Sequence, residues 1–571
     1  MTPQSPGATH PVRAGLSAFC TLLPHKGDLL AARRNPKRDV LAGITVAIVA
    51  LPLALAFGAA SGLGAQAGIA TAVIAGAVAA VFGGSNLQVS GPTGAMTVVL
   101  VPVAHEFGPT GVLMVGLMAG VALVAMALAR LGRYVRYLPA PVIEGFTAGI
   151  AVVIALQQVP AALGVTGLEG EKVWALAAQA VRTFAENPEP APLVVAVGVT
   201  VVILLGARWR PSWPFSLVAV ALATVAAVGG PFVLTPLGAI PAGLPAPSLA
   251  FFDAGALGAL STAAVAVAAL AALESLLSAT VADGMSVNER HDPDRELFGQ
   301  GLANIAAPLF GGIPGTAAIA RTAVNVRAGA GSKLAALTHA IVLLLIVLVA
   351  SRWVSHIPLA ALAGVLFATT IRMVEFASLR ALARSTKGDG FILVLTFAAT
   401  VLIDLVTAVI IGLGVAVLLA LRAVARTARV EQVPLEAGDY TAQEHALLTE
   451  HIVAYRLDGP LFFAAAHRFL LELTEIADVR IVILRMSRVS TIDATGAQVL
   501  GDAITKLEKW GIVVLMSGIH PYHDAVMAKL GVASHLSEQG RIFEDTPSAI
   551  TYARELLTDV SARTDAERAG G

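Results

Sequence analysis

The feature that most constrains this chain is a long stretch without charge. No Asp, Glu, Lys or Arg occurs between residues 40 and 104, and the whole chain is 56% hydrophobic and only 13% charged. Soluble domains carry about 25% charged residues. Uncharged apolar runs of this length are typical of helices that cross a lipid bilayer. The sequence therefore predicts an integral membrane protein.

Fourteen apolar segments are long enough to cross or enter a bilayer. A full span needs about 17–25 residues, and several of these segments are shorter or are broken by Gly and Pro. They fall at residues 40–60, 66–83, 92–107, 110–129, 140–162, 191–206, 214–230, 256–282, 296–310, 315–328, 333–351, 357–372, 390–405 and 406–424. The predicted fold class is membrane all-α with about fourteen transmembrane segments.

Basic residues in the loops predict the orientation of these segments. Cytoplasmic loops are enriched in Lys and Arg, and such clusters follow the fourth, sixth, twelfth and fourteenth segments, with Arg352 as the one exception. The loop after the fifth segment is acidic on balance. Residues 1–39 hold six basic side chains but no apolar core, so we predict a cytoplasmic N-terminal segment and no cleaved signal peptide. Both ends of the chain are expected in the cytoplasm.

Two similar breaks suggest an internal repeat. Gly91-Pro92-Thr93-Gly94-Ala95 opens the third segment, and Ile313-Pro314-Gly315-Thr316-Ala317 opens the tenth, with prolines 222 positions apart (314 − 92). Many transporters consist of two such repeats. Because seven is odd, the repeat at 256–425 would be inverted relative to the one at 40–230. Two half-helices would then point their N-termini at each other near the membrane midplane.

Arg321 lies just after the second break, within Gly311–Arg327. A helix start carries partial positive charge, and a nearby arginine adds a full one, so this stretch favours an anion-binding site inside the membrane. An arginine at a helix centre in the bilayer costs about 2.5–3.5 kcal/mol on insertion scales, so it needs a reason. The alternatives are that Arg321 snorkels to the cytoplasmic face or pairs with Glu274 for structure alone.

Glu274 is the only charged residue between Asp253 and Asp283. A lone carboxylate in a membrane helix is either protonated or paired, and it can titrate as a site opens and closes. It is therefore a candidate proton-coupling residue, or a ligand for a small cation together with Ser278 one turn later. A static salt bridge is the structural alternative.

Other classes of function lack support in the sequence. The formal net charge is zero, which does not suggest nucleic acid as a partner. Cys20 is the single cysteine, and the pair His520 and His523 has no third ligand nearby, so we predict no metal site. We find no catalytic constellation and expect neither an enzyme nor a cofactor, apart from a co-transported H⁺ or Na⁺.

The character of the chain changes after about residue 430. Residues 446–558 alternate polar and apolar runs as a soluble α/β domain does, after a linker at 426–445 and before a flexible tail at 559–571. The strand candidates are Ile452–Leu457, Ile481–Leu484 and Ile512–Met516, and the helix candidates are Ala464–Glu475, Thr495–Trp510 and Asp524–Leu530.

The chain resembles the sulfate permease (SulP) family of anion transporters, whose members carry a C-terminal STAS domain. The resemblance covers residues 36–558. The stretches that carry it are Phe82-Gly-Gly-Ser-Asn-Leu-Gln-Val-Ser-Gly-Pro-Thr93, Pro141-Val-Ile-Glu-Gly-Phe-Thr-Ala-Gly149, Pro314 followed seven residues later by Arg321, and Ser490-Thr-Ile-Asp-Ala-Thr-Gly496.

The resemblance implies a seven-plus-seven inverted repeat. A core domain of segments 1–4 and 8–11 moves against a gate domain, and the substrate lies between the starts of segments 3 and 10. The resemblance also implies a homodimer, a cytoplasmic protein partner at the STAS domain, and Thr495 as a candidate phosphorylation site, its alternative being a plain helix residue. The candidate substrate-binding residues are Leu53, Thr93, Gly94, Ala95, Thr316, Ala317, Ala318, Ile319, Ala320 and Arg321.

Two details bear on the substrate. Leu53 stands where many sulfate-type members have Gln, and Gly91-Pro-Thr-Gly-Ala-Met-Thr-Val-Val99 looks closer to the bicarbonate-type branch. We therefore expect a secondary active transporter in a bacterial plasma membrane that moves bicarbonate, a dicarboxylate or sulfate by alternating access. Coupling to H⁺ is favoured over Na⁺. The rival functions are an uncoupled anion channel or exchanger, and a membrane-anchored STAS regulatory protein.

Overall fold

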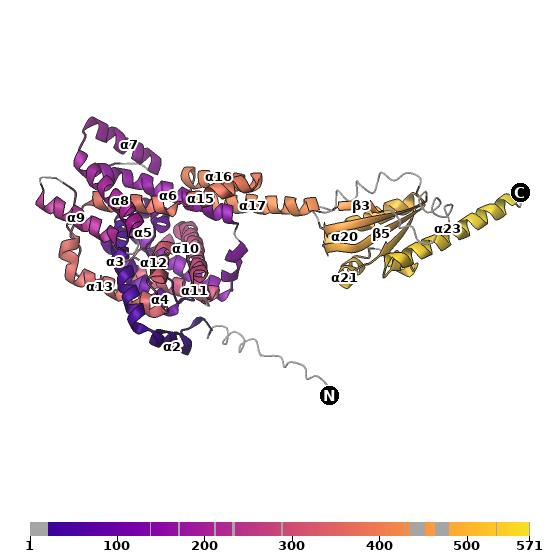
Figure 1. Ribbon diagram of the computed structural model, residues 1–571, viewed down its shortest axis with the longest axis horizontal. Coiled ribbons are helices and arrows are strands. Elements are labelled where there is room, and N and C mark those ends of the chain that lie inside the picture. The colour runs from indigo at the N-terminus through magenta and orange to yellow at the C-terminus, as the bar shows by residue number, and fades with distance from the viewer. Residues whose placement is uncertain are drawn as a thin grey trace. The chain divides into compact units, whose positions relative to one another are not determined.

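A computed structural model of the chain describes residues 21–137, 139–168, 172–210, 213–230, 234–286, 289–427, 429–433, 451–462, 479–532 and 534–569. The chain divides into two compact units, one ending at Leu413 and the other beginning at Gly414 (Figure 1). The first unit is helical, and the second contains a five-stranded sheet.

Each of the fourteen predicted segments falls on a helix of the structure. Nine helices in the described ranges are long and apolar enough to cross a membrane. The helices are α2 (Lys26–Arg34), α3 (Pro36–Ala60), α4 (Ala65–Phe82), α5 (Gly94–Leu128), α6 (Ala140–Leu163), α7 (Val173–Glu186), α8 (Pro190–Trp209), α9 (Phe215–Gly229), α10 (Leu257–Met285), α11 (Pro293–Leu309), α12 (Ile319–Arg327), α13 (Lys333–Val354), α14 (Leu359–Met373), α15 (Phe376–Ser385), α16 (Lys387–Leu402) and α17 (Leu405–Thr427).

The structure keeps one predicted boundary inside a single labelled helix and departs from the prediction in two other places. Helix α5 spans segments 3 and 4 under one label, but its backbone breaks between them at Gly108, where they are predicted to separate; the φ of 68° suits glycine, and the next residue, Pro109, lacks a backbone donor. The helix of the tenth predicted segment, α12, begins at Ile319, four residues later than predicted, because Thr316–Ala317 forms a strand. The amphipathic helix α7 lies in the predicted acidic loop, where Ala177 and Ala180 are buried.

Helix packing separates two groups within the membrane unit. Helices α3, α4, α5, α10, α11, α12 and α13 pack mainly on one another, and α6, α8, α9, α14 and α16 form the second group. Contacts of α3 with α9 and α14, and of α5 with α6, join the groups. This division matches the core and gate domains that the family resemblance implies.

Small residues allow the core helices to approach closely. A methyl group added to Gly58 of α3 would lie 2.6 Å from the backbone nitrogen of Gly68 in α4, and one added to Gly68 would clash with the carbonyl of Ala54. Close backbone approach at small residues is a common way to associate helices in a membrane, where burial of apolar surface supplies little driving force. The core therefore depends on backbone proximity as much as on side-chain volume.

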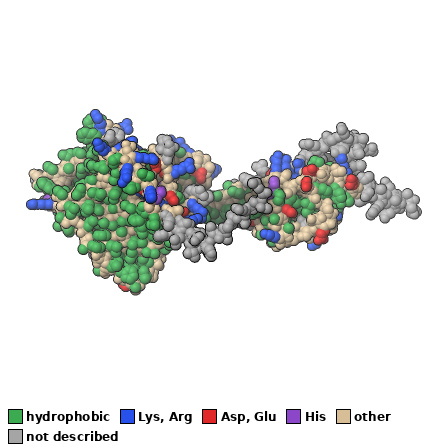
Figure 2. Space-filling view, turned by 90° about the horizontal axis from the view of Figure 1, so that it is seen from below, with side chains coloured by type: hydrophobic (Ala, Val, Ile, Leu, Met, Phe, Trp, Pro, Cys, Tyr) green, Lys and Arg blue, Asp and Glu red, His purple; other side chains and the backbone are tan. Residues whose placement is uncertain are grey.

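The outer surface of the first unit is apolar. Figure 2 shows a broad, nearly continuous hydrophobic surface with the charged side chains gathered mainly along one edge. Val349, Trp353 and Ile410 are 81%, 78% and 66% exposed. An exposed apolar surface of this extent suits contact with lipid and not with water.

The second unit is an α/β domain. Its sheet has the order β3-β4-β5-β6-β7, antiparallel at β3 and parallel elsewhere. Its elements are β3 (Arg429–Val433), β4 (Ile452–Leu461), β5 (Ile481–Ile492), α20 (Ala494–Lys509), β6 (Val513–Ser517), α21 (Pro521–Lys529), α22 (Ser534–Glu538), β7 (Ile542–Phe543) and α23 (Thr546–Ala569).

Alternating side chains of the central strand β5 build two cores in this domain. Val482 and Leu484 pack in the cluster that includes α20, whereas Ile481 and Ile483 pack with Ala549 of α23. Successive strand residues point to opposite faces, so both faces of the parallel sheet are covered. The three strands predicted in this domain are confirmed, and the predicted helix Ala464–Glu475 lies outside the described residues.

The structure has regular elements in two ranges beside this domain that the sequence predicts to be a linker and a flexible tail. Strand β3 lies within the range 426–445 predicted as a linker, because it pairs with β4 along five residue positions. Helix α23 continues to Ala569, through most of the range 559–571 predicted as a flexible tail. Residues 559–569 consist largely of Ala, Arg, Asp and Glu, several of which have good helix propensity, so this part extends an anchored helix.

Candidate functional site

The two Gly-Pro breaks meet in the core of the membrane unit. Strand β1 (Ser90–Gly91) pairs antiparallel with β2 (Thr316–Ala317), with Ser90 opposite Ala317 and Gly91 opposite Thr316. Helix α5 begins three residues after β1, and α12 begins two residues after β2. Because the strands run in opposite directions, the two helices leave the crossing in opposite directions with their N-termini beside it. This arrangement agrees with the spacing of the two prolines.

Buried amide and hydroxyl groups hold the broken backbone at this crossing. The side chain of Asn304 in α11 donates to the carbonyl of Gly315 at 2.9 Å and accepts from its N–H at 2.9 Å. Thr71 Oγ1 donates to the carbonyl of Ile313 at 2.8 Å, and Gln300 Nε2 donates to Ser90 Oγ at 2.5 Å. Non-helical backbone at membrane depth is tolerated when protein groups satisfy it in this way.

Glu274 connects the two helix starts. Its Oε2 atom accepts hydrogen bonds from Thr93 Oγ1 at 2.8 Å and from Thr316 Oγ1 at 2.6 Å. Thr93 is also the N-cap of α5, and it accepts from the N–H of Met96. The next residue of α10, Ser275, accepts from the N–H of Ala317 at 3.3 Å. Helix α10 therefore contacts both halves of the crossing through two successive side chains.

The side chain of Arg321, in the second repeat, contacts the backbone of the first repeat. Its side chain is 1% exposed, and Nη2 donates to the carbonyl of Pro92 at 2.6 Å rather than to the carboxylate of Glu274. Nη1 lies close to Gly91, where a methyl group would approach it to 2.5 Å, and this nitrogen has no hydrogen-bond partner within the described part of the chain. Arg321 therefore neither snorkels to the surface nor forms a direct ion pair with Glu274.

Ser278 does not meet Glu274. Its hydroxyl donates instead to Thr322 Oγ1 at 3.0 Å, and Thr322 also accepts from the N–H of Val89 at 3.1 Å. Ser278 follows Glu274 by one helical turn, which separates the two Cβ atoms by about 5–6 Å. At this distance Ser278 contacts α12 and not the Glu274 carboxylate. The hydroxyl groups beside the Glu274 carboxylate are those of Thr93 and Thr316.

The remaining predicted residues line the two helix starts to different degrees. Gly94, Ala95 and Ala317 are buried, Leu53 and Ala318 are half-buried, and Ile319 and Ala320 are exposed. The N-cap of α12, Ala318, offers no side-chain cap. The first N–H groups of α12 therefore remain available for a ligand, whereas the start of α5 is capped by Thr93.

Sequence reasoning missed two apolar residues at the start of α5. A methyl group on Gly94 would clash with Ile154 of α6 and would come within 3.1 Å of Phe57 of α3. Phe57 follows Leu53 by one helical turn, so this spacing was the available signal. Ile154 had no signal in the sequence, because its position depends on how α6 packs against the core.

Thr495 lies in the first turn of α20 and is exposed. The N-cap of this helix is Asp493, whose carboxylate accepts from the N–H of Gly496 at 2.7 Å. The Thr495 hydroxyl is therefore accessible from solvent at a helix start.

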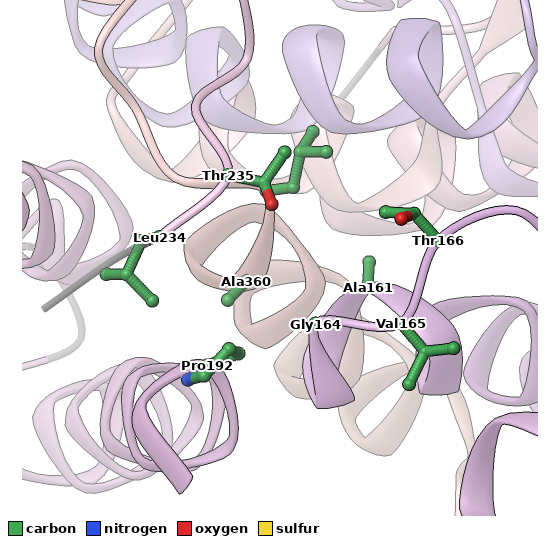
Figure 3. A pocket seen from close by; sticks show the side chains of 9 residues that line it. Ala161, Gly164, Val165, Thr166, Pro192, Leu234, Thr235 and Ala360 are labelled. Carbon is green, nitrogen blue, oxygen red and sulfur yellow. The ribbon is translucent and has the colours of Figure 1, made fainter. Parts of the chain in front are cut away.

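One pocket lies away from these residues. Figure 3 shows its lining, which comes from α6, α8, α14 and the loops beside them and offers the hydroxyls of Thr166 and Thr235 as side-chain polar groups. Its other lining residues are Ala161, Gly164, Val165, Pro192, Leu234, Leu359 and Ala360. None of the predicted substrate-binding residues lines it, and it has no charged side chain to attract an anion, so the helix-start crossing is the better candidate site.

Comparison with known proteins places this geometry in a family. Residues 37–396 match the model of the sulfate permease family, and residues 446–549 match that of the STAS domain. The chain is 35% identical to YvdB of Bacillus subtilis over 88% of its length and 95% of that protein's. It is 33% identical to the bicarbonate transporter BicA of Synechocystis over 91% of its length and 94% of that protein's.

Solved structures agree. The transmembrane domain of a cyanobacterial BicA is 35% identical and superposes with a TM-score of 0.61, covering 66% of this chain and 98% of that one. SLC26A9, at 17% identity, shares the fold with a TM-score of 0.82 over 97% of this chain and 96% of its own. The predicted fold class, with its inverted repeats and C-terminal α/β domain, is confirmed. The chain belongs to the sulfate permease family of multi-pass anion transporters and carries a C-terminal STAS domain.

Proposed function

We propose that the protein is a proton-coupled symporter of a small anion, with Glu274 as the residue that binds the coupled proton. The observation that carries the proposal is that a single carboxylate accepts hydrogen bonds from both helix starts. A change in the charge of that carboxylate acts on both halves of the anion site at once. Binding of the proton at Glu274 therefore changes the affinity of the site for the anion, and binding of the anion changes the affinity of Glu274 for the proton.

The hydrogen bonds at Glu274 favour a proton over a sodium ion. Both threonine hydroxyls donate to Oε2, which leaves Oε1 as the atom that can take up a proton without breaking either bond. A sodium ion would instead need oxygen lone pairs converging on it. Thr93 and Thr316 direct hydrogens at Glu274, and Ser278 directs its hydrogen at Thr322.

The anion site combines the uncapped start of α12 with the buried charge of Arg321. Helix N–H groups and a fixed cation attract an anion more strongly in a site that excludes water than in solution. Exposed Ile319 and Ala320 mark the open side of the start of α12. Arg321 is held by the carbonyl of Pro92, so that its charge serves both repeats.

The anion is a small oxyanion, namely bicarbonate, a dicarboxylate or sulfate. Bicarbonate is the substrate in the name of BicA, whereas the name of YvdB assigns sulfate only provisionally. Leu53 in place of a polar side chain near the site also supports bicarbonate-type substrates.

Transport proceeds by alternating access. The start of α5 packs against Ile154 of the gate group and Phe57 of the core group. Movement of the core against the gate opens this apolar contact and exposes the anion to one side of the membrane. We further propose a bacterial plasma membrane location with both termini in the cytoplasm, a homodimer, a cytoplasmic protein partner at the STAS domain, and no enzymatic activity.

The test is uptake of radiolabelled bicarbonate, sulfate and small dicarboxylates into proteoliposomes, with a pH gradient, a Na⁺ gradient or neither. One proton per anion lets a gradient of one pH unit support about tenfold accumulation. We expect this accumulation for the native chain and its loss in Glu274→Gln, which keeps an acceptor oxygen for Thr93 and Thr316. Accumulation driven by Na⁺ alone, or no concentrative uptake under any gradient, would overturn proton coupling, and the second result would favour the channel or exchanger.

A further inference from the structure

Helix α2, which precedes the first transmembrane helix, has two chemically different faces. Its nine residues read Lys-Gly-Asp-Leu-Leu-Ala-Ala-Arg-Arg from Lys26 to Arg34. Leu29 and Leu30 are 58% and 61% exposed, and Lys26, Arg33 and Arg34 are exposed as well. At 100° per residue these five side chains lie on one side of the helix, and Asp28, Ala31 and Ala32 lie on the other.

The inner face fixes α2 to the core helices. Asp28 accepts from Arg295 Nη2 of α11 at 2.5 Å, and its carboxylate is 3.6 Å from Lys333 Nζ of α13. Helix α2 also packs against α13 and α3. The only acidic residue of the helix therefore faces inward, and its outward face combines two leucines with three positive charges.

The position of α2 brings this outward face close to the lipid. Asn35 alone separates α2 from α3, and Leu41 in the first uncharged stretch of α3 is 64% exposed. The five helical rises from Pro36 to Leu41 span about 8 Å, which is close to the thickness of one headgroup layer beside the hydrocarbon. The lipid-facing surface of α3 thus begins within the first six residues after Asn35.

We propose that α2 lies in the membrane interface, with its two leucines in the acyl boundary and its three basic side chains on the headgroups of anionic lipids. Leucines and basic residues on one exposed face are the pattern of helices that lie in an interface, because long basic side chains extend from the apolar layer to the headgroups. Anionic lipids on the same side attract such juxtamembrane charges. The contacts of Asp28 with Arg295 of α11 and Lys333 of α13, here called the Asp28 clamp, tie the anchored helix to α11, which also carries Gln300 and Asn304 of the helix-start crossing.

The experiment uses the full-length chain with its single cysteine replaced, Cys20→Ser, and one nitroxide-labelled cysteine at Leu30. Vesicles contain phosphatidylcholine alone or with phosphatidylglycerol. Relaxation of the label by oxygen, which concentrates in the acyl layer, is compared with relaxation by a water-soluble nickel chelate. Matched labels at Val349, 81% exposed on α13, and at Tyr522, 71% exposed in the STAS domain, give the lipid and water references.

We expect the label at residue 30 to resemble that at residue 349 in vesicles with phosphatidylglycerol. The double change Arg33→Gln and Arg34→Gln is expected to shift it toward the water reference. A label at residue 30 that matches residue 522 in both lipid mixtures would overturn the proposal and would assign this face to water or to a protein. Lipid burial that depends on neither phosphatidylglycerol nor the two arginines would overturn the headgroup contact. A label at Leu29 repeats the measurement if the first variant folds poorly.

Discussion

At the scale of single residues, the site depends on how hydroxyl groups orient one carboxylate. Thr316 donates to Glu274 and lies in β2, so it links the carboxylate to the strand crossing. A hydrogen bond to a charged group contributes about 1.5–3 kcal/mol. Thr316→Val keeps the shape but removes the donor. We expect it to abolish pH-driven accumulation or to reduce it at least tenfold, while Thr316→Ser, which keeps the donor, retains most of it. Equal uptake by the two variants would show that the hydroxyl has no part in coupling.

Arg321 gives a second prediction at this scale. Arg321→Met removes the buried charge and the bond to Pro92, so we expect binding of the transported anion to the purified protein to be lost in calorimetry. Arg321→Lys keeps the charge but replaces a planar fork with a point charge, and we expect weakened binding rather than none. Thr224→Ala is the control, because the Thr224 hydroxyl bonds to Val220 of its own helix and, among the residues that the structure describes, to no other group. Undiminished anion binding by Arg321→Met would move the anion site elsewhere.

The sequence was informative about which charged residues matter and silent about their partners. Glu274 and Arg321 stood out because each is a lone charge in an apolar surrounding. Their contacts join residues 181 and 229 positions apart, from Thr93 to Glu274 and from Pro92 to Arg321. Such pairings follow from tertiary packing and not from local spacing. For the same reason Ser278 was assigned to Glu274 by helical spacing, although it bonds to Thr322 of another helix.

At the scale of elements, apolar length located the helices, but strand pairing set where the half-helix begins. Helix α12 starts at Ile319 because β2 pairs with β1, more than 220 residues away in sequence. A two-residue strand such as Thr316–Ala317 has no local pattern that separates it from a helix start. The break in α5, in contrast, is readable from Gly108 and Pro109, and it lies in the predicted gap between the third and fourth segments.

Asn304 supplies the prediction for these elements. Asn304→Ala leaves the N–H and the carbonyl of Gly315 unpartnered in a buried setting. Each unsatisfied buried group costs about 1–3 kcal/mol, so we expect the free energy of unfolding to fall by about 2–4 kcal/mol and uptake to fall with it. Thermal unfolding in detergent measures the change. Asn304→Asp restores the acceptor for the Gly315 N–H and is expected to recover part of the loss, and an unchanged melting temperature in Asn304→Ala would contradict the role of this side chain.

The clamp of α2 gives a pH prediction. Burial would raise the pKa of Asp28, but the hydrogen bond from Arg295 and the charge of Lys333 outweigh it and lower the pKa from 3.8 to about 2. A lowered pKa in the folded state stabilises the docked helix above pH 3.8, and that stabilisation is lost as the pH falls toward 2. We expect Asp28→Asn to remove about 1–2 kcal/mol, allowing for solvent screening. Amide exchange of α2 should accelerate in this variant at neutral pH, and unchanged exchange would contradict the clamp.

At the scale of the whole molecule, the chain joins two units that each bury their own core. The clusters around α20 and α23 belong to the STAS domain, and the residues of the proposed anion site belong to the membrane unit. A chain that ends after α17, lacking residues 428–571, therefore keeps all the residues described above at the helix-start crossing. We expect this truncated chain to remain folded and to transport the same anion with the same dependence on the pH gradient, while binding of a cytoplasmic partner is lost.

Uptake by matched amounts of full-length and truncated protein in proteoliposomes measures this. Glu274→Gln in the truncated chain is the control for coupled transport. The truncated chain could also lose coupled uptake while thermal unfolding shows that its membrane unit is still folded. The STAS domain would then be part of the transport machinery and not a separate module for partner binding.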